Sequence, residues 1–101
     1  MKQIKNDLKE IKLYFENKEQ LDFYYNNNPH LDNWIQKRAT SYGYVVSLAP
    51  VHIQEIYIEL YVNHKTVFQL AHEKYCSEQY LTKRKRELFE FIYKHKEKIY
   101  S

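Results

Sequence analysis

The stretch that decides the fold runs from Lys65 to Ile92, KTVFQLAHEKYCSEQYLTKRKRELFEFI. Thr66 can cap a short helix, because its hydroxyl can accept hydrogen bonds from the free amides of the first turn. Apolar residues follow at helical spacing, namely Val67, Leu70 and Ala71. Ser77, just after Cys76, is placed to cap a second helix in the same way. The stretch therefore predicts a helix, a tight turn and a second helix.

The second helix of this pattern has an apolar side and a cationic side. Leu81, Leu88 and Ile92 recur at helical spacing, and Lys85 lies on their side, where its aliphatic stem can cover the core. The opposite side carries amide, hydroxyl and cationic groups: Gln79, Thr82, Lys83 and Arg86. A helix with these two sides suits the major groove of DNA, which admits an α-helix.

The order Thr66, Leu70-Ala71, Ser77, Leu81 and Leu88 resembles the helix-turn-helix of region four of the sigma-70 family. In that family a Thr precedes an Ile-Ala pair, and a Ser opens the recognition helix. Two positions depart from the pattern. Tyr75 stands where the family usually has Gly, and Arg84 stands where it often has a hydrophobic residue.

The second half of the chain is also similar to the RinA/ArpU-like late transcription activators of phages from low-GC Gram-positive bacteria. The run from Ile56 to Asn63, the Cys76-Ser77 pair and the cluster from Lys83 to Arg86 carry this likeness. The first half shares only the helical outline. The resemblance implies an activator that binds double-stranded DNA in a late promoter region and acts with host RNA polymerase. Regulators of this kind are also plausible targets of inhibitor proteins encoded by competing mobile elements.

Several side chains of the second helix have the chemistry that DNA recognition needs. Gln79 can pair with an adenine edge and Arg86 with a guanine edge, because both present two hydrogen-bonding groups side by side. Lys83, Arg84 and Lys85 suit phosphates, which fix position without reading sequence. The full candidate DNA-binding set is Ser77, Gln79, Tyr80, Thr82, Lys83, Arg84 and Arg86. The alternative interpretation is a solvated basic side on a structural helix. Three acids on this helix count against a purely electrostatic mode of binding: Glu78, Glu87 and Glu90.

Composition predicts a mostly helical chain. Its 101 residues include one Gly and two Pro, too few turn formers for a strand-rich fold of this size. The formal charge is only +3, but residues 83–101 hold seven Lys/Arg against three Glu, whereas residues 51–82 hold two Lys against four Glu. A basic end on a balanced chain favours a nucleic-acid partner. The expected fold is an all-α small helical bundle with a C-terminal helix-turn-helix and a long basic recognition helix.

The first part of the chain, residues 1–48, is expected to serve packing or dimerisation, and residues 49–101 to form the region-four-like part. Residues 2–16 predict an amphipathic helix with a heptad-like apolar seam, while Asp7 and Glu10 are expected on its solvent sides. The seam consists of Ile4, Leu8, Ile11 and Phe15. The seam favours packing within the chain, and a homodimer through residues 2–25 is the competing hypothesis.

In the middle of the chain, two non-helical segments are expected to separate the helices. Residues 19–27 predict a second helix or a continuation, and a third is expected from Pro29, capped by Asn28, to about residue 40. Trp34 on that helix is expected in the core. Residues 40–44 predict a turn, and residues 44–48 an extended connector.

Pro50 is expected to start the helix before the deciding stretch. Its apolar residues form one stripe at Ile53, Ile56, Tyr57 and Leu60 and another at Ile58 and Val62. Asn63-His64 should end it, since Asn tolerates the left-handed conformation. The final helix is expected to reach about Tyr100.

No enzyme, metal site or cofactor site is indicated. The five His are scattered, with His52 and Glu55, or His64 and His72, as the only pairs worth weighing, and the single Gly leaves no phosphate-binding loop. Cys76 stands alone, which favours a reducing compartment, and no apolar run approaches the span of a bilayer. The expected location is the cytoplasm, of a host cell if the chain is phage-encoded. Two other functions compete: a protein-interaction module that binds a transcription component without DNA, and a small DNA-recognition subunit of a packaging enzyme.

Overall fold

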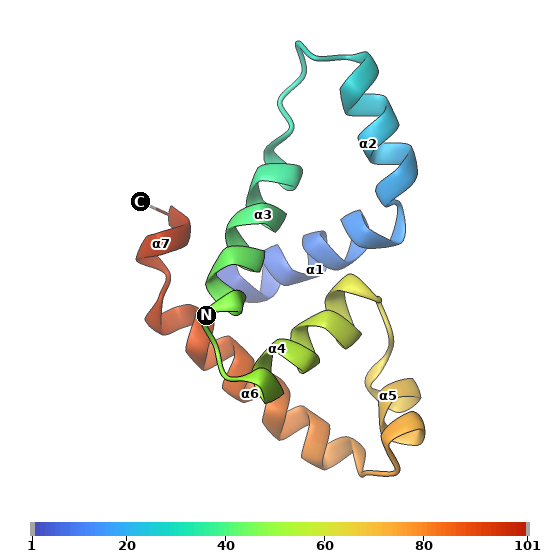
Figure 1. Cartoon of the computed structure of the whole chain (residues 1–101), viewed down its shortest axis with the longest axis vertical. Helices are drawn as coiled ribbons and strands as arrows, with labels where there is room; N and C mark the ends of the chain where they lie inside the picture. The colour runs from blue at the N-terminus through green and yellow to red at the C-terminus, as the bar shows by residue number, and fades with distance from the viewer. Residues whose placement is uncertain (1, 101) are drawn as a thin grey trace.

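The computed structural model describes residues 2–100, and every regular element in that range is helical. The all-α class is therefore confirmed. Within these residues no helix has the length and apolar character that crossing a membrane requires. In chain order (Figure 1) the elements are α1 (Lys2–Glu16), α2 (Lys18–Asn27), α3 (Trp34–Ser47), α4 (Val51–Tyr57), the π-helical turn η1 (Ile58–Val62), α5 (Val67–Lys74), α6 (Glu78–Lys94) and α7 (Glu97–Tyr100).

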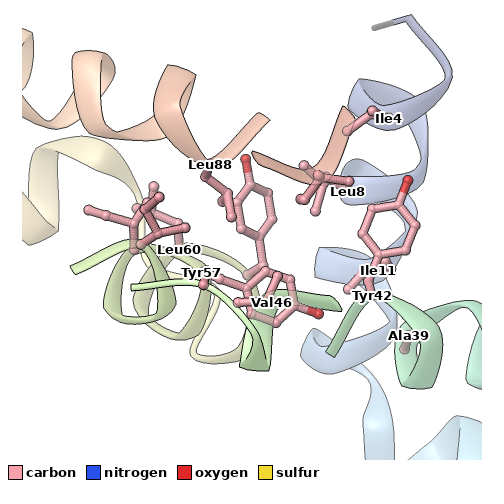
Figure 2. Packing of buried hydrophobic residues seen from close by; sticks show 14 of the residues in the cluster. Ile4, Leu8, Ile11, Ala39, Tyr42, Val46, Tyr57, Leu60 and Leu88 are labelled. Carbon is pink, nitrogen blue, oxygen red and sulfur yellow. The ribbon is translucent and has the colours of Figure 1, made fainter. Parts of the chain in front are cut away.

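One hydrophobic core joins the two halves of the chain. The apolar side of α1 packs against η1, α3 and α6, and α4 packs against α6. Figure 2 shows Leu8 of α1 and Leu88 of α6 in one cluster with Tyr57 and Leu60. Burying one such leucine side chain contributes about 1.5–3 kcal/mol. The seam residues Ile4, Leu8 and Ile11 are thus buried within this chain, as the intramolecular alternative predicted, and their side of α1 is already covered.

A buried carboxylate ties the first helix to the last. Asp7, expected on a solvent side of α1, is only 4 % exposed, which corrects that expectation. Its Oδ2 accepts hydrogen bonds from Arg38 Nη1 at 2.7 Å, from the Tyr42 hydroxyl at 2.7 Å and from the Tyr100 hydroxyl, and its Oδ1 accepts one from Gln3 Nε2 at 3.0 Å. Burial by itself would raise the pKa of Asp7, but the hydrogen bonds from Tyr100, Tyr42 and Arg38 outweigh it and lower the pKa below its usual value. We call these five side chains the Asp7 cluster.

A second carboxylate, Asp22, holds α2 against its neighbours. The hydroxyl of Tyr14 in α1 donates to Asp22 at 2.6 Å, and Gln36 in α3 donates at 2.8 Å. Lys18, one turn earlier in α2, forms an ion pair with Asp22 at 2.6 Å. Hydrogen bonds from Lys18 and Tyr14 lower the pKa of Asp22 to about 2. Since α2 has no fully buried side chain, these polar contacts are important for its placement.

The helix α3 differs from its expected bounds at both ends. Asn28 and Pro29 lie in an irregular segment, and the helix begins at Trp34. Trp34 is 46 % exposed and does not anchor the core, because it occupies the first position of a helix whose buried side starts at Ile35. These two expectations were wrong.

The predicted turn at residues 40–44 and the extended connector at 44–48 were also wrong, because α3 continues to Ser47 and Leu48 is its C-cap. Gly43 weakens a helix by about 1 kcal/mol relative to Ala. Its neighbours Tyr42, Val45 and Val46 are all buried against the core. Their burial outweighs the poor helical propensity of the glycine and of the β-branched valines.

The helix expected from Pro50 is present, with one change of character. Its predicted stripe is buried in full, at Ile53, Ile56, Tyr57 and Leu60. The second expected stripe is divided, because Ile58 is 44 % exposed whereas Val62 is partly buried against the core. The chain widens into η1, where the Asn63 amide donates to Ile58 O at 2.7 Å. The left-handed residue that follows is His64, with φ 46°, and not Asn63.

The last helix is shorter than expected. It ends at Lys94, and α7 follows after a break at His95 and Lys96. This break turns α7 back toward α3, where Tyr100 reaches the Asp7 cluster (Figure 1). The continuous run to Tyr100 was therefore wrong.

Candidate nucleic-acid interface

Two side-chain caps and one left-handed residue set the position of α6. Thr66 Oγ1 accepts from the Gln69 amide at 3.0 Å, and Gln69 Oε1 accepts from the Thr66 amide at 2.9 Å, so α5 opens with a reciprocal capping box. Ser77 Oγ accepts from the Tyr80 amide at 3.0 Å and opens α6. Tyr75 ends α5 with φ 54° and ψ 42°, a conformation that Gly adopts more readily. Both predicted caps are confirmed.

Four of the candidate residues share one exposed surface. Gln79, Thr82, Lys83 and Arg86, together with Glu78, line a shallow depression of about 330 Å³ on α6. This surface lies opposite the buried residues of α6: Leu81, Leu88 and Ile92. Within residues 2–100, Lys83 and Arg86 take part in no ion pair, so their charges are available to a partner. We call this surface the α6 face.

Three other candidates lie away from the α6 face. Ser77 uses its hydroxyl as the helix cap. Arg84 points to the α4 side of α6, where it donates two hydrogen bonds to Glu87 at 2.9 and 2.8 Å. Its guanidinium also lies over the ring of Tyr80, 5.0 Å from the centroid. Arg84 and Tyr80 thus form an intramolecular group with Glu87.

The acidic residues of α6 are distributed unevenly. Glu87 is neutralised by Arg84, whose hydrogen bond lowers the pKa of the carboxyl, and His52 Nε2 lies 3.5 Å from it. Glu78 lies at the start of α6, where a negative charge is favoured by the helix dipole. Glu90 is exposed one turn beyond Arg86. The cationic part of the α6 face is therefore confined to its first half, between these two acids.

Sequence reasoning missed a second group of cations, contributed mainly by α1. Lys5, Lys9 and Lys12 line a groove with Lys85 and Arg86 of α6. Their spacing of four and three residues is the signal that could have revealed them, because it places all three on one side of a helix. Burial, followed by the charges of Lys12, Lys5 and Lys9, lowers the pKa of Lys85. As predicted, Lys85 lies over the core with its amine toward this groove and Phe89, 5.8 Å from the ring centroid.

No group of three or more His, Cys, Asp or Glu side chains is arranged to hold a metal ion in the part of the chain that the structure describes. Cys76 is half-buried at the turn before α6 and packs against the core.

Comparison with known proteins identifies no related family, because no protein-family model, curated protein or solved structure matches this chain.

Proposed function

We propose that this chain is a sequence-specific DNA-binding transcription regulator in which α5, the turn at residues 75–77 and α6 act as a helix-turn-helix. The observation that carries the proposal is the α6 face. It presents an amide, a hydroxyl and two unpaired cations from one rigid helix, whose opposite side is anchored in the core. Recognition helices commonly contact bases with residues near their N-terminal ends, and here the polar and cationic residues occupy the first half of α6.

The roles of the four residues on this face follow from their chemistry. Arg86 would read a guanine and Gln79 an adenine through paired hydrogen bonds, while Lys83 would bind a phosphate. Thr82 would contact a base edge or a thymine methyl. Arg84 would support the helix through Glu87 and not bind DNA directly.

The finer proposal is a phage late-gene activator that acts with host RNA polymerase. It rests on the resemblance of residues 56–63, 76–77 and 83–86 to the RinA/ArpU-like activators. A monomer that covers one short site binds weakly, because tight specific binding usually needs two half-sites or a second protein. Polymerase would supply the missing contacts without a dimer through the buried side of α1.

The test begins with duplex DNA enriched from a random-sequence pool on the purified full chain. Binding is then measured by fluorescence anisotropy at several salt concentrations. Arg86→Ala and Gln79→Ala should each cost about 1–3 kcal/mol of discrimination at one base position. Lys83→Ala should weaken all sequences alike and reduce the salt slope by about one. Lys37→Ala, an exposed lysine on α3, is the matched control and should leave the base preference unchanged.

A pool that yields no enriched sequence would overturn DNA recognition. In a reporter assay with host polymerase, the double variant Lys83→Ala/Arg86→Ala should abolish activation. Activation that survives this variant would instead support an interaction module that contacts a transcription component without DNA.

A further inference from the structure

The groove beside α6 combines an apolar floor with a cationic rim. It lies between α1, η1, the start of α5 and α6 and has a volume of about 590 Å³. Leu8 and Leu60 line it and are almost fully buried, so its accessible apolar surface comes mainly from the partly exposed Val67 and Phe89. Hydrophobic side chains of a partner would lose contact with water on this floor.

The rim carries five cations without an acidic partner. Within residues 2–100, no ion pair or side-chain hydrogen bond involves any member of this set: Lys5, Lys9, Lys12, Lys85 and Arg86. A sixth cation, Lys65, is already neutralised by Glu59 at 2.6 Å and Glu73 at 2.7 Å. Glu16 is the next acid along this side of α1, one turn beyond Lys12, and it forms no ion pair within the described residues.

These cations repel one another. The lowered pKa of Lys85 reflects its burial and then the three α1 lysines around its amine. Anionic groups bound along the rim would relieve that repulsion. The rim is therefore complementary to a partner that brings several negative charges.

We propose that this groove binds an amphipathic helical segment of another protein, with leucine- or phenylalanine-sized side chains on one side and carboxylates along its edge. The apolar side would pack on the partly exposed Val67 and Phe89, above the buried Leu8 and Leu60, and the carboxylates would pair with Lys5, Lys9 and Lys12. The three lysines span about 10 Å along α1, a distance that acids at the same helical spacing match.

The floor distinguishes this occupant from a strand of DNA. A phosphate backbone would engage the lysines but would gain nothing from an apolar floor, whereas an amphipathic helix uses both. The proposal does not depend on DNA binding by the α6 face. The two surfaces meet at Thr82 and Arg86, which line both the groove and the depression on α6.

The test measures binding of a labelled synthetic peptide to the full chain by fluorescence anisotropy. The peptide forms about five helical turns, with leucines at core spacing and glutamates along one edge, and a matched peptide carries glutamine in place of glutamate. The groove variant is Lys5→Ala/Lys9→Ala/Lys12→Ala, and the control variant, Lys37→Ala/Lys94→Ala/Lys98→Ala, removes the same charge from exposed lysines outside the groove. Circular dichroism establishes that both variants are folded.

The glutamate peptide should bind the unmodified chain. Its affinity should fall about tenfold or more for the groove variant and less than about threefold for the control variant. A second variant, Val67→Asp, should also weaken it, because it places a charge on the groove wall. Binding should slow acylation of the Lys85 amine. Absence of binding, equal binding of the glutamine peptide, or equal losses in the two triple variants would each overturn the proposal. A groove variant that loses binding to duplex DNA but still binds the peptide would also overturn the proposal, because the three lysines would then be binding phosphates.

Discussion

The two halves of this molecule are held together by different physics. In the N-terminal half, hydrogen bonds to Asp7 and Asp22 join residues far apart in the chain. In the C-terminal half, α5 and α6 are set by side-chain caps that span three residues each, above an apolar stripe. The comparison teaches that the N-terminal half depends on charge and on distant contacts, whereas the candidate interface is built largely from local ones.

Removal of Asp7 should have the largest effect on this comparison. Asp7→Ala leaves two tyrosine hydroxyls and the partly buried guanidinium of Arg38 without their acceptor, and we expect a loss of about 3 kcal/mol in the free energy of unfolding. Urea denaturation at neutral pH measures it. Asp32→Ala, at an exposed aspartate outside both clusters, should change stability by less than about 0.5 kcal/mol. A loss at Asp7 as small as that of the control would show that the cluster contributes no net stability.

Acid should weaken the N-terminal half next. The pKa values of Asp7 and Asp22 are lowered in the folded state, the latter to about 2, so both carboxylates stabilise the fold above their unfolded pKa near 3.8. This stability is lost as the pH falls from about 4 toward about 2. Amide exchange followed by NMR should show α1, α2 and α7 losing protection before α5 and α6. The pKa values of Glu59 and Glu87 in the other half are also lowered, but both side chains are partly exposed, whereas Asp7 is buried, so each contributes less than Asp7. Simultaneous loss in both halves would remove the distinction.

The caps should give a smaller, local effect. Thr66→Ala and Ser77→Ala should each cost about 1 kcal/mol, since each leaves amides of a first turn without an acceptor. Exchange of the amides of Gln69 and Tyr80 should speed up while α1 is unaffected. Thr82→Ala in the middle of α6 has no cap to lose and should be neutral or slightly stabilising. Destabilisation of α1 as large as that of α5 would show that the caps are not local.

The smallest effects concern the single glycine and the left-handed tyrosine. Gly43→Ala should stabilise α3 by about 0.5–1 kcal/mol, because a Cβ at this helical position meets no atom within 4 Å. Tyr75→Gly should stabilise the turn by about 0.5 kcal/mol, because Tyr75 adopts φ 54° while its side chain is 97 % exposed and packs on little. Thermal unfolding of each variant measures the change. A lower melting temperature for Tyr75→Gly would mean that the tyrosine ring makes contacts that offset its backbone strain.

The same division explains what the sequence could predict. Around Thr66 and Ser77 the signals are local, so both helices start where the caps indicated. The side of α6 that carries Gln79, Lys83 and Arg86 followed from helical periodicity alone. Arg84 shows the limit of that reasoning, because its pairing with Glu87 depends on rotamers that periodicity does not specify.

The errors concentrate where distant contacts decide. Gly43 predicted a break, but the core covers Tyr42 and Val46 and keeps α3 continuous. Trp34 has the large apolar ring of a core residue, but it is the first residue of α3 and is 46 % exposed, because the buried side of that helix starts at Ile35. The break at His95 has no strong local signal, and its consequence is visible only once Tyr100 meets Asp7.

The bond between Tyr100 and Asp7 joins two residues that are 93 positions apart. At a synthesis rate of about 5–20 residues per second, the aspartate emerges on the order of 5–20 s before its partner exists. Over most of that interval α1 lacks both this hydrogen bond and the packing of α6, including Leu88, against its apolar side. The native arrangement of the N-terminal half is thus completed only when translation has delivered Tyr100.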